Sequence, residues 1–409
     1  MSAQRPRPVP FVLLLVVVGV AGLNLRAGLG SVPPLLPSIR SDLAINNTQA
    51  GLITSVAVLA IGLFAPLGQR LGARIGAQRA TAWCLAALCV AETARLIPAG
   101  IEVLFVTTAA TGGAMGAASS MIPALISVHA GRWRGLAMGV YTTGLAMGIG
   151  AAAALALPLE RILGSWRASL GALGLAALAA TILWTTVMVR GQPRQEAVAD
   201  GAARFGLPWS SRAARLLTLF YAMQMLVGYG CMAWISPLYV SLGQSAQDAA
   251  GLFVVFQVVQ VATMVGLPAL SDLTTDRRPF IGLTVLCCCV GVALLLTAPL
   301  AFAVPAVALC GLGAGGGATL AFVLMVDSTD NVIDGSRLTA MSLLVGNVVG
   351  AASPLMLGAI KDLTGTFAPG LAVLLVASVG MLALVRSFAP GVRMEETKAR
   401  QLQGDRHVL

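Results

Sequence analysis

An arginine inside a long apolar segment is the residue of this sequence with the clearest chemical meaning. Arg26 follows Asn24 within residues 11–36, where Ser31 is the only other polar side chain. A charge at the centre of a lipid bilayer costs about 2.5–3.5 kcal/mol on insertion scales, so it normally faces a cavity or a partner. The guanidinium stays protonated and offers a planar fork of donors to a carboxylate. We therefore expect Arg26 to bind an anionic or strongly polar solute, with Asn24 and Arg95 assisting. Pairing with an internal acid and extension toward the membrane interface are the alternatives.

One carboxylate also lies well inside an apolar segment. Glu92 belongs to residues 80–97, whereas the other acidic residues map to the ends of apolar segments or outside them. A proton-coupled carrier needs a protonatable group within the membrane, and Glu92 meets this requirement, so we assign it to coupling. Arg95 follows three positions later on the same helix face. An ion pair between the two side chains is the alternative role.

Neutral polar and aromatic side chains recur within the later apolar segments. Amide and hydroxyl groups orient a solute by hydrogen bonds without adding charge. Gln257 and Gln260 share a helix face because they are three residues apart. Hydrogen bonds across helices are the alternative for each member of the set. The side chains expected to face a solute path are Tyr141, Gln224, Tyr229, Trp234, Gln257, Gln260 and Asn347.

The sequence lacks the motifs of the common enzyme and ATP-driven mechanisms. It contains no Walker A, HExxH or GxSxG pattern, and the glycine-rich run 311–316 lies in an apolar segment instead of following a strand. The seven cysteines fall in apolar segments without CxxC pairs, and the chain has only two histidines. We expect no catalytic activity, no cofactor and no metal.

Twelve apolar segments hold these residues. The chain is 57% hydrophobic and 10% charged, with a mean hydropathy of +0.88, whereas soluble domains have about 25% charged residues. Each segment is long enough to cross about 30 Å of hydrocarbon as a helix. We predict an all-α membrane protein with twelve transmembrane helices. The segments are 11–36, 50–69, 80–97, 101–126, 136–158, 168–189, 216–240, 249–271, 279–298, 301–326, 338–360 and 369–386.

The net charge of +10 lies in the connections between these segments. With a cytoplasmic N-terminus, most of the 26 Lys and Arg residues fall on the cytoplasmic side. The positive-inside rule therefore places both termini in the cytoplasm. The basic charge is topological, so we expect a lipid bilayer and not nucleic acid as the surrounding partner.

The second half of the chain repeats the first. Residues 50–52 match residues 250–252, and residues 134–138 match residues 337–341. We predict a six-helix bundle over 1–189, a cytoplasmic linker over 190–215, a second six-helix bundle over 216–386 and a cytoplasmic tail over 387–409. Two such bundles with a solute site near the midplane are typical of a rocker-switch secondary transporter.

Glycines spaced four residues apart favour close helix packing and sliding. The pairs are Gly112/Gly116, Gly144/Gly148, Gly311/Gly315 and Gly346/Gly350. Ordinary packing of membrane helices without motion is the alternative.

Two motifs resemble known transporters. The basic, glycine-containing turn 68–79 resembles a degenerate loop signature of the major facilitator superfamily, with Ala73 where the acidic residue is usual. This resemblance implies gating roles for Arg74 and, in the second half, for Asp272 and Arg277, while simple topogenic charge is the alternative. Residues 24–26, followed by Pro34–Pro37, resemble the first span of the cyanate permease and nitroimidazole transporter family within that superfamily. Similar residues continue through Trp234 to Pro390.

The resemblance implies transport of a small anionic or polar organic solute across a bacterial inner membrane. We expect a monomeric secondary transporter that operates by alternating access, with proton coupling, exchange and facilitated transport left open. A proton-coupled exporter of drug-like compounds such as nitroimidazoles is the first alternative. A membrane sensor or assembly partner is the second, although the tail 387–409 is too short for a signalling domain.

Overall fold

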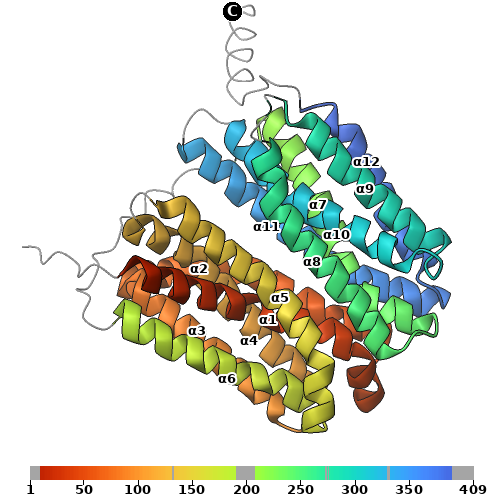
Figure 1. The fold of residues 1–409 in the computed structure, drawn as a ribbon, viewed down its shortest axis with the longest axis horizontal. Coiled ribbons are helices and arrows are strands. Elements are labelled where there is room, and N and C mark those ends of the chain that lie inside the picture. The colour runs from red at the N-terminus through yellow and green to blue at the C-terminus, as the bar shows by residue number, and fades with distance from the viewer. Residues whose placement is uncertain are drawn as a thin grey trace, which may run out of the picture. The chain divides into compact units, whose positions relative to one another are not determined.

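Twelve α-helices make up the part of the chain that the computed structural model describes, which is residues 10–130, 133–189, 208–271, 274, 276–328 and 332–388 (Figure 1). No strand occurs within these ranges. The first six helices are α1 (Phe11–Leu43), α2 (Asn47–Ile75), α3 (Ala77–Thr93), α4 (Ile101–His129), α5 (Arg134–Leu163) and α6 (Trp166–Trp184). The others are α7 (Arg212–Ser241), α8 (Ala246–Ser271), α9 (Arg278–Thr297), α10 (Ala303–Asp327), α11 (Val332–Thr364) and α12 (Ala368–Val385). A 3-10 turn, η1 (Ala94–Leu96), extends α3, and a π-helical turn, η3 (Thr185–Val189), extends α6.

The twelve predicted apolar segments correspond one to one with these helices, which confirms the all-α fold class. Eleven of the helices are long and apolar enough to cross a membrane, and α3, with 17 residues, is the twelfth. Most helices are longer than the apolar segments within them. The prediction ended the first segment at residue 36, whereas α1 continues to Leu43 through Pro33, Pro34 and Pro37. Hydropathy marks the apolar part of a helix and not its last hydrogen-bonded turn.

Local sequence signals explain why α1 and α2 are separate helices. Ala44 follows α1 in a left-handed conformation, with φ of 50°. The side chain of Asn46 then accepts a hydrogen bond from the backbone of Gln49, while the Gln49 side chain accepts one from the backbone of Asn46. This reciprocal capping box satisfies backbone donors that the first turn of a helix leaves free.

The chain divides into two compact units. Unit 1 comprises Met1–Ala199 and Ala233–Val258, and unit 2 comprises Asp200–Met232 and Val259–Leu409. Unit 1 thus contains α1 to α6 together with parts of α7 and α8. The predicted linker 190–215 includes the division near residue 199, and the predicted bundle limits stay a prediction.

Glycines bring helix backbones into contact in unit 1. A Cβ atom added at Gly148 of α5 would clash with the carbonyl oxygen of Leu23 on α1, and one at Gly30 of α1 would clash with the carbonyl oxygen of Ile149. A Cβ atom at Gly116 of α4 would likewise meet the backbone of α2. The pairs α1/α5 and α2/α4 therefore pack closely because these positions have no side chain.

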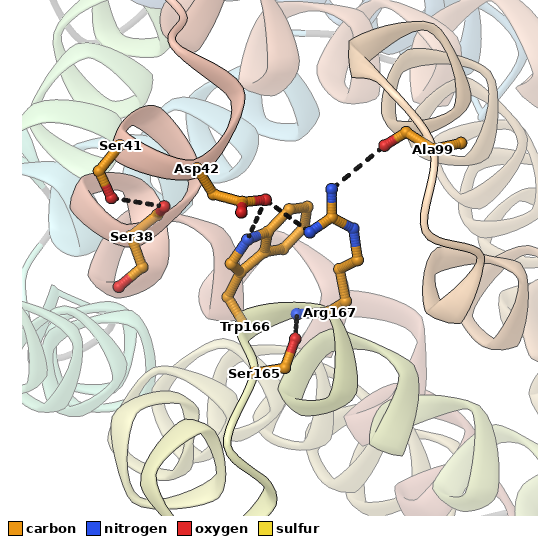
Figure 2. Close-up of polar contacts among 7 residues, drawn as sticks. All are labelled: Ser38, Ser41, Asp42, Ala99, Ser165, Trp166 and Arg167. Atoms are coloured by element: carbon orange, nitrogen blue, oxygen red, sulfur yellow. Dashed lines mark hydrogen bonds and ion pairs between the residues drawn. The ribbon is translucent and has the colours of Figure 1, made fainter.

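An ion pair ties three segments of unit 1 together (Figure 2). A guanidinium nitrogen of Arg167, at the start of α6, lies 2.5 Å from a carboxylate oxygen of Asp42, at the end of α1. Arg167 also donates to the carbonyl oxygen of Ala99 at 3.2 Å, and its guanidinium lies 4.3 Å from the ring centroid of Trp166. The Trp166 indole donates to the same Asp42 oxygen at 3.1 Å. These contacts join α1 and α6 to the connection that precedes α4.

Unit 2 packs its helices with more side-chain contacts. A Cβ atom at Gly346 of α11 would meet the ring of Tyr221 on α7, and one at Gly350 would meet the ring of Tyr229. Between α9 and α10, a Cβ atom at Gly291 would lie 2.7 Å from the backbone nitrogen of Cys310. Close packing in unit 2 therefore involves aromatic side chains as well as backbones.

Candidate solute site

Arg26 lies near the middle of α1 and is half-buried. It is one helical turn from Gly22 and one from Gly30, so it shares the α1 face that carries both glycines. A Cβ atom at Gly22 would meet the backbone of Tyr141, and one at Gly30 that of Ile149, so this face packs on α5. Arg26 forms no hydrogen bond or ion pair with the described part of the chain. Within that part, no internal acid neutralises the guanidinium.

Two buried hydroxyl groups accompany Arg26. The Tyr141 hydroxyl of α5 lies close enough to Arg26 to interact with it electrostatically. The Tyr141 hydroxyl also lies close enough to the buried hydroxyl of Ser119 on α4 to interact with it, and neither hydroxyl has another hydrogen-bond partner among the described residues. Two hydroxyls that bond to each other still leave one O–H donor free, and buried donors are nearly always hydrogen-bonded. Together the three side chains offer donors to an anion.

Ser119 does not stand out as a ligand in the amino-acid sequence. It stands beside Ser120 in a run of small residues, and no periodicity separates the two. In the structure, the Ser120 hydroxyl donates to the carbonyl oxygen of Ala117 in its own helix at 2.7 Å. Only Ser119 of this pair is left for another partner. Three-dimensional contacts were needed to distinguish them.

The side-chain amides of Asn24 and Gln257 differ in whether they form hydrogen bonds within the described chain. The amide nitrogen of Asn24 donates to the carbonyl oxygen of Val20 in α1 at 2.9 Å. Gln257 belongs to the part of α8 in unit 1 and is 1% exposed, and both its amide atoms lack a partner within the described ranges. Its Cβ atom lies 3.7 Å from the position of a Cβ atom built on Gly150 of α5. Gln257 therefore has a donor and an acceptor available next to α5.

The other predicted solute-path residues have varied surroundings. Gln224 of α7 is buried, and its amide nitrogen donates to the carbonyl oxygens of Gly313 and Ala314 at 2.8 and 3.2 Å. This amide nitrogen stabilises the packing of α7 on α10 within unit 2. The remaining predicted residues are Trp234, which is buried in unit 1, and Tyr229, Gln260 and Asn347, which are half-buried in unit 2.

Glu92 and Arg95 occupy a different part of unit 1. They are 1% and 3% exposed. Arg95 borders a small cavity whose α1 lining consists of Gly28, Leu29 and Val32. Gly28 lies about 200° around the helix from Arg26, whereas Leu29, three residues from Arg26, lies on the same side as Arg26. The expected assistance of Arg95 to Arg26 stays a prediction.

The predicted alternative of an ion pair between Glu92 and Arg95 needs revision. The two side chains interact electrostatically, yet within the described ranges they form no ion pair. Arg95 instead donates from Nη2 to the Thr111 hydroxyl at 3.3 Å. Arg95 lies in the 3-10 turn η1, which follows α3.

The predicted gating residues lie at helix ends. Arg74 is exposed in the last turn of α2, next to Gly76, whose φ of 90° makes the sharp turn into α3. Arg277, directly before α9, donates from Nη1 to the buried hydroxyl of Ser271 at 2.7 Å. Asp272 lies outside the described residues.

Comparisons with known proteins agree with this architecture. The family model described as Major Facilitator Superfamily matches residues 14–354. The 2-nitroimidazole transporter of Escherichia coli (strain K12) is 27% identical over 379 residues, covering 91% of this chain and 95% of that protein. The cyanate transport protein CynX of the same organism is 26% identical over 380 residues, covering 92% and 97%.

Solved structures share the fold. A D-xylose-proton symporter superposes with a TM-score of 0.74 at 16% identity, covering 94% of this chain and 99% of that one. A bacterial homolog of the human lysosomal transporter Spinster, in an inward-facing and unoccupied conformation, also has a TM-score of 0.74 at 16% identity, covering 92% and 95%.

The fold and these matches define a multi-pass membrane protein of the transporter class. The chain belongs to the major facilitator superfamily, and its resemblance to the cyanate and nitroimidazole transporters is confirmed.

Proposed function

We propose that this protein is a secondary transporter of a small anionic organic solute across a bacterial inner membrane, and that Arg26 binds the anion. The observation that carries the proposal is a half-buried guanidinium near the middle of α1 with no anionic partner in the described chain. Removing a charge from water costs several kcal/mol unless a partner compensates it, and a bound anion supplies that partner. The neighbouring hydroxyls of Tyr141 and Ser119 add a neutral donor.

The proposed mechanism is alternating access by a rocker switch in a monomer with both termini in the cytoplasm. Binding of the anion offsets the incomplete solvation of Arg26, so the solute stabilises one conformation relative to another and shifts their populations. Gln257, with both amide atoms available, is the further ligand that unit 1 supplies. Asn24, Trp234, Tyr229, Gln260 and Asn347 stay secondary candidates, and Arg74, Asp272 and Arg277 stay candidates for gating.

Coupling to protons is the second part of the proposal. An inside-negative membrane potential opposes entry of an anion by about 2.3 kcal/mol per charge per 100 mV, so uptake needs a proton or an exchanged ion. Glu92 is a buried acid of unit 1 and has a carboxylate oxygen without a partner. We assign proton binding to Glu92. Uptake into pH-clamped proteoliposomes with and without an imposed proton gradient tests this step, and Glu92→Gln should lose the response to the gradient.

The decisive experiment compares Arg26→Ala with Arg40→Ala, because both arginines belong to α1 but Arg40 lies in its last turn. Uptake of labelled cyanate and small carboxylates is measured in proteoliposomes of each folded variant. We expect Arg26→Ala to abolish transport, Arg26→Lys to reduce it at least about tenfold because the planar fork is lost, and Arg40→Ala to retain it. Normal transport of the anions by Arg26→Ala would exclude the proposed site.

Export of neutral drug-like compounds is the second candidate function. It is favoured by the 27% identity to a 2-nitroimidazole transporter over 91% of this chain. A neutral solute does not need the charge of Arg26. If this function is correct, Arg26→Ala still transports 2-nitroimidazole, and neutral nitroaromatics compete with transport better than small carboxylates do.

A further inference from the structure

Glu92 and Arg95 form a buried charged cluster that the solute site does not explain. Oε1 of Glu92 and both Nε and Nη1 of Arg95 are buried and have no hydrogen-bond partner within the described ranges. Of the Arg95 nitrogens, Nη2 donates a hydrogen bond to the Thr111 hydroxyl. Two opposite charges in electrostatic range but without a direct ion pair have a gap between them. Buried charges that lack hydrogen bonds are costly, so the gap requires an occupant.

The small cavity beside Arg95 supplies the space for that occupant. It is lined by α1, α2, η1 and α4, and its polar lining consists of Arg95 and the threonines Thr54, Thr108 and Thr111. The buried hydroxyl of Thr108 has no partner in the described chain. The cavity offers about 10 Å³ to the centre of a water molecule, which is about the minimum that one water needs.

Gly28 connects this cavity to Glu92. It lines the cavity, and a Cβ atom added to it would lie 3.0 Å from Oε1 of Glu92 and 3.2 Å from Cγ2 of Thr111. The position that a side chain of Gly28 would occupy is therefore bordered by the Glu92 carboxylate and by two residues that line the cavity, Thr111 and Met115. Arg95 and Thr108 line the cavity directly, and Oε1 of Glu92 lies next to Gly28 at its edge.

We propose that this cavity is a binding site for one ordered water molecule, which links Arg95 and Thr108 to Glu92. The water oxygen accepts a hydrogen bond from Arg95, and a water proton is donated to the carboxylate. A larger anion does not fit the volume, and the neighbouring carboxylate repels it. The water-bridged pair holds α1, α3 and α4 of unit 1 together. This inference does not depend on which solute is carried.

The direct test is a crystal or cryo-EM structure of the full-length protein at a resolution that resolves ordered waters. We expect density in the cavity within hydrogen-bonding distance of Arg95 and Thr108. An empty cavity in a well-resolved map, or a direct contact between the guanidinium and the carboxylate, would overturn the proposal.

A matched pair of threonines gives a second test that does not need the map. Thr107 and Thr108 are adjacent and both buried, but the Thr107 hydroxyl donates to carbonyl oxygens of its own helix at 2.8 and 3.1 Å. We expect Thr108→Val to lower the melting temperature of the purified protein more than Thr107→Val does, and Thr108→Ser to restore it. In a dry cavity, Thr108→Val removes an unpartnered hydroxyl, so a melting temperature at or above that of the parent protein contradicts the bound water.

Discussion

Unit 1 and unit 2 bury their polar side chains in different ways. Unit 1 contains the buried charges of Glu92 and Arg95, the half-buried Arg26 and the unpartnered amide of Gln257. In the described part of unit 2, the fully buried polar side chains are neutral, and Gln224 donates to two carbonyl oxygens of α10. An unpartnered buried polar group costs about 1–3 kcal/mol. That cost is concentrated in unit 1, so we infer that the ligand chemistry belongs mainly to unit 1.

Two helix contacts, α1/α5 in unit 1 and α7/α11 in unit 2, differ in what their glycines meet. Gly148 of α5 meets a backbone carbonyl of α1, whereas Gly350 of α11 meets the ring of Tyr229 on α7. A backbone carbonyl inside a helix has no freedom to move aside, but an aromatic ring is able to rotate. The helix that carries Arg26 is therefore fixed more firmly against its neighbour than the α7/α11 contact of unit 2.

The largest predicted effect concerns the charged cluster of unit 1. Arg95→Leu leaves Glu92 buried without its counter-charge, and removing one partner of a buried pair typically destabilises by about 3–5 kcal/mol. The double variant Glu92→Leu with Arg95→Leu removes both charges, so we expect it to melt at a higher temperature than Arg95→Leu alone. Gln224→Leu in unit 2, which removes neutral hydrogen bonds, should cost about 1–3 kcal/mol.

Thermal unfolding of the purified variants measures this difference. If Gln224→Leu destabilises the protein more than Arg95→Leu, the contrast between the charged unit 1 and the neutral unit 2 is wrong. If the double variant is no more stable than Arg95→Leu, the two charges do not act as a pair.

The next prediction compares one glycine from each unit. Alanine is preferred over glycine in a helix by about 1 kcal/mol, and this gain is common to both positions. At Gly148 the added methyl group overlaps a carbonyl oxygen of Leu23, and overpacking typically costs about 1–3 kcal/mol or more. We expect Gly148→Ala to lower the melting temperature more than Gly350→Ala, whose added methyl group would meet the Tyr229 ring at 2.7 Å and Cβ of Met225 at 3.0 Å. Equal effects would show that the two helix contacts are equally rigid.

A smaller effect is expected at the adjacent serines of α4. Ser119→Ala removes a hydroxyl that lies next to Tyr141, the neighbour of Arg26, so we expect KM for the solute to rise by up to about tenfold, which corresponds to about 1.4 kcal/mol. Ser120→Ala removes a hydroxyl that is bonded within its own helix and should leave KM unchanged. Initial uptake rates in proteoliposomes over a range of solute concentrations measure both values. An unchanged KM in Ser119→Ala would remove this hydroxyl from the site.

The sequence predicted the helices better than the contacts of their side chains. Long apolar runs determine where helices cross a membrane, so all twelve segments appear as helices. Arg26 was identifiable because a charge in an apolar run is costly wherever it faces. The residues that surround Arg95 and Ser119 depend on how α1, α3 and α4 pack, and an apolar pattern does not determine that packing. Gln224 was expected on the solute path, but its amide nitrogen bonds α10, and an apolar pattern does not distinguish these environments.

The smallest predicted effect is that of Asp276 on the pH profile of transport. Asp276 belongs to unit 2 and lies just before α9. The hydrogen bonds from the Arg278 guanidinium lower the pKa of Asp276 below its usual value, because they favour the charged carboxylate. A lowered pKa means that the favourable contact is present at neutral pH and is lost only when the pH falls through that low value. Between about pH 5 and pH 8, Asp276 therefore stays ionised. We expect transport by Asp276→Asn to follow the same pH profile as the parent protein, whereas Glu92→Gln flattens it. A profile that shifts in Asp276→Asn and not in Glu92→Gln would move the titrating group from unit 1 to unit 2.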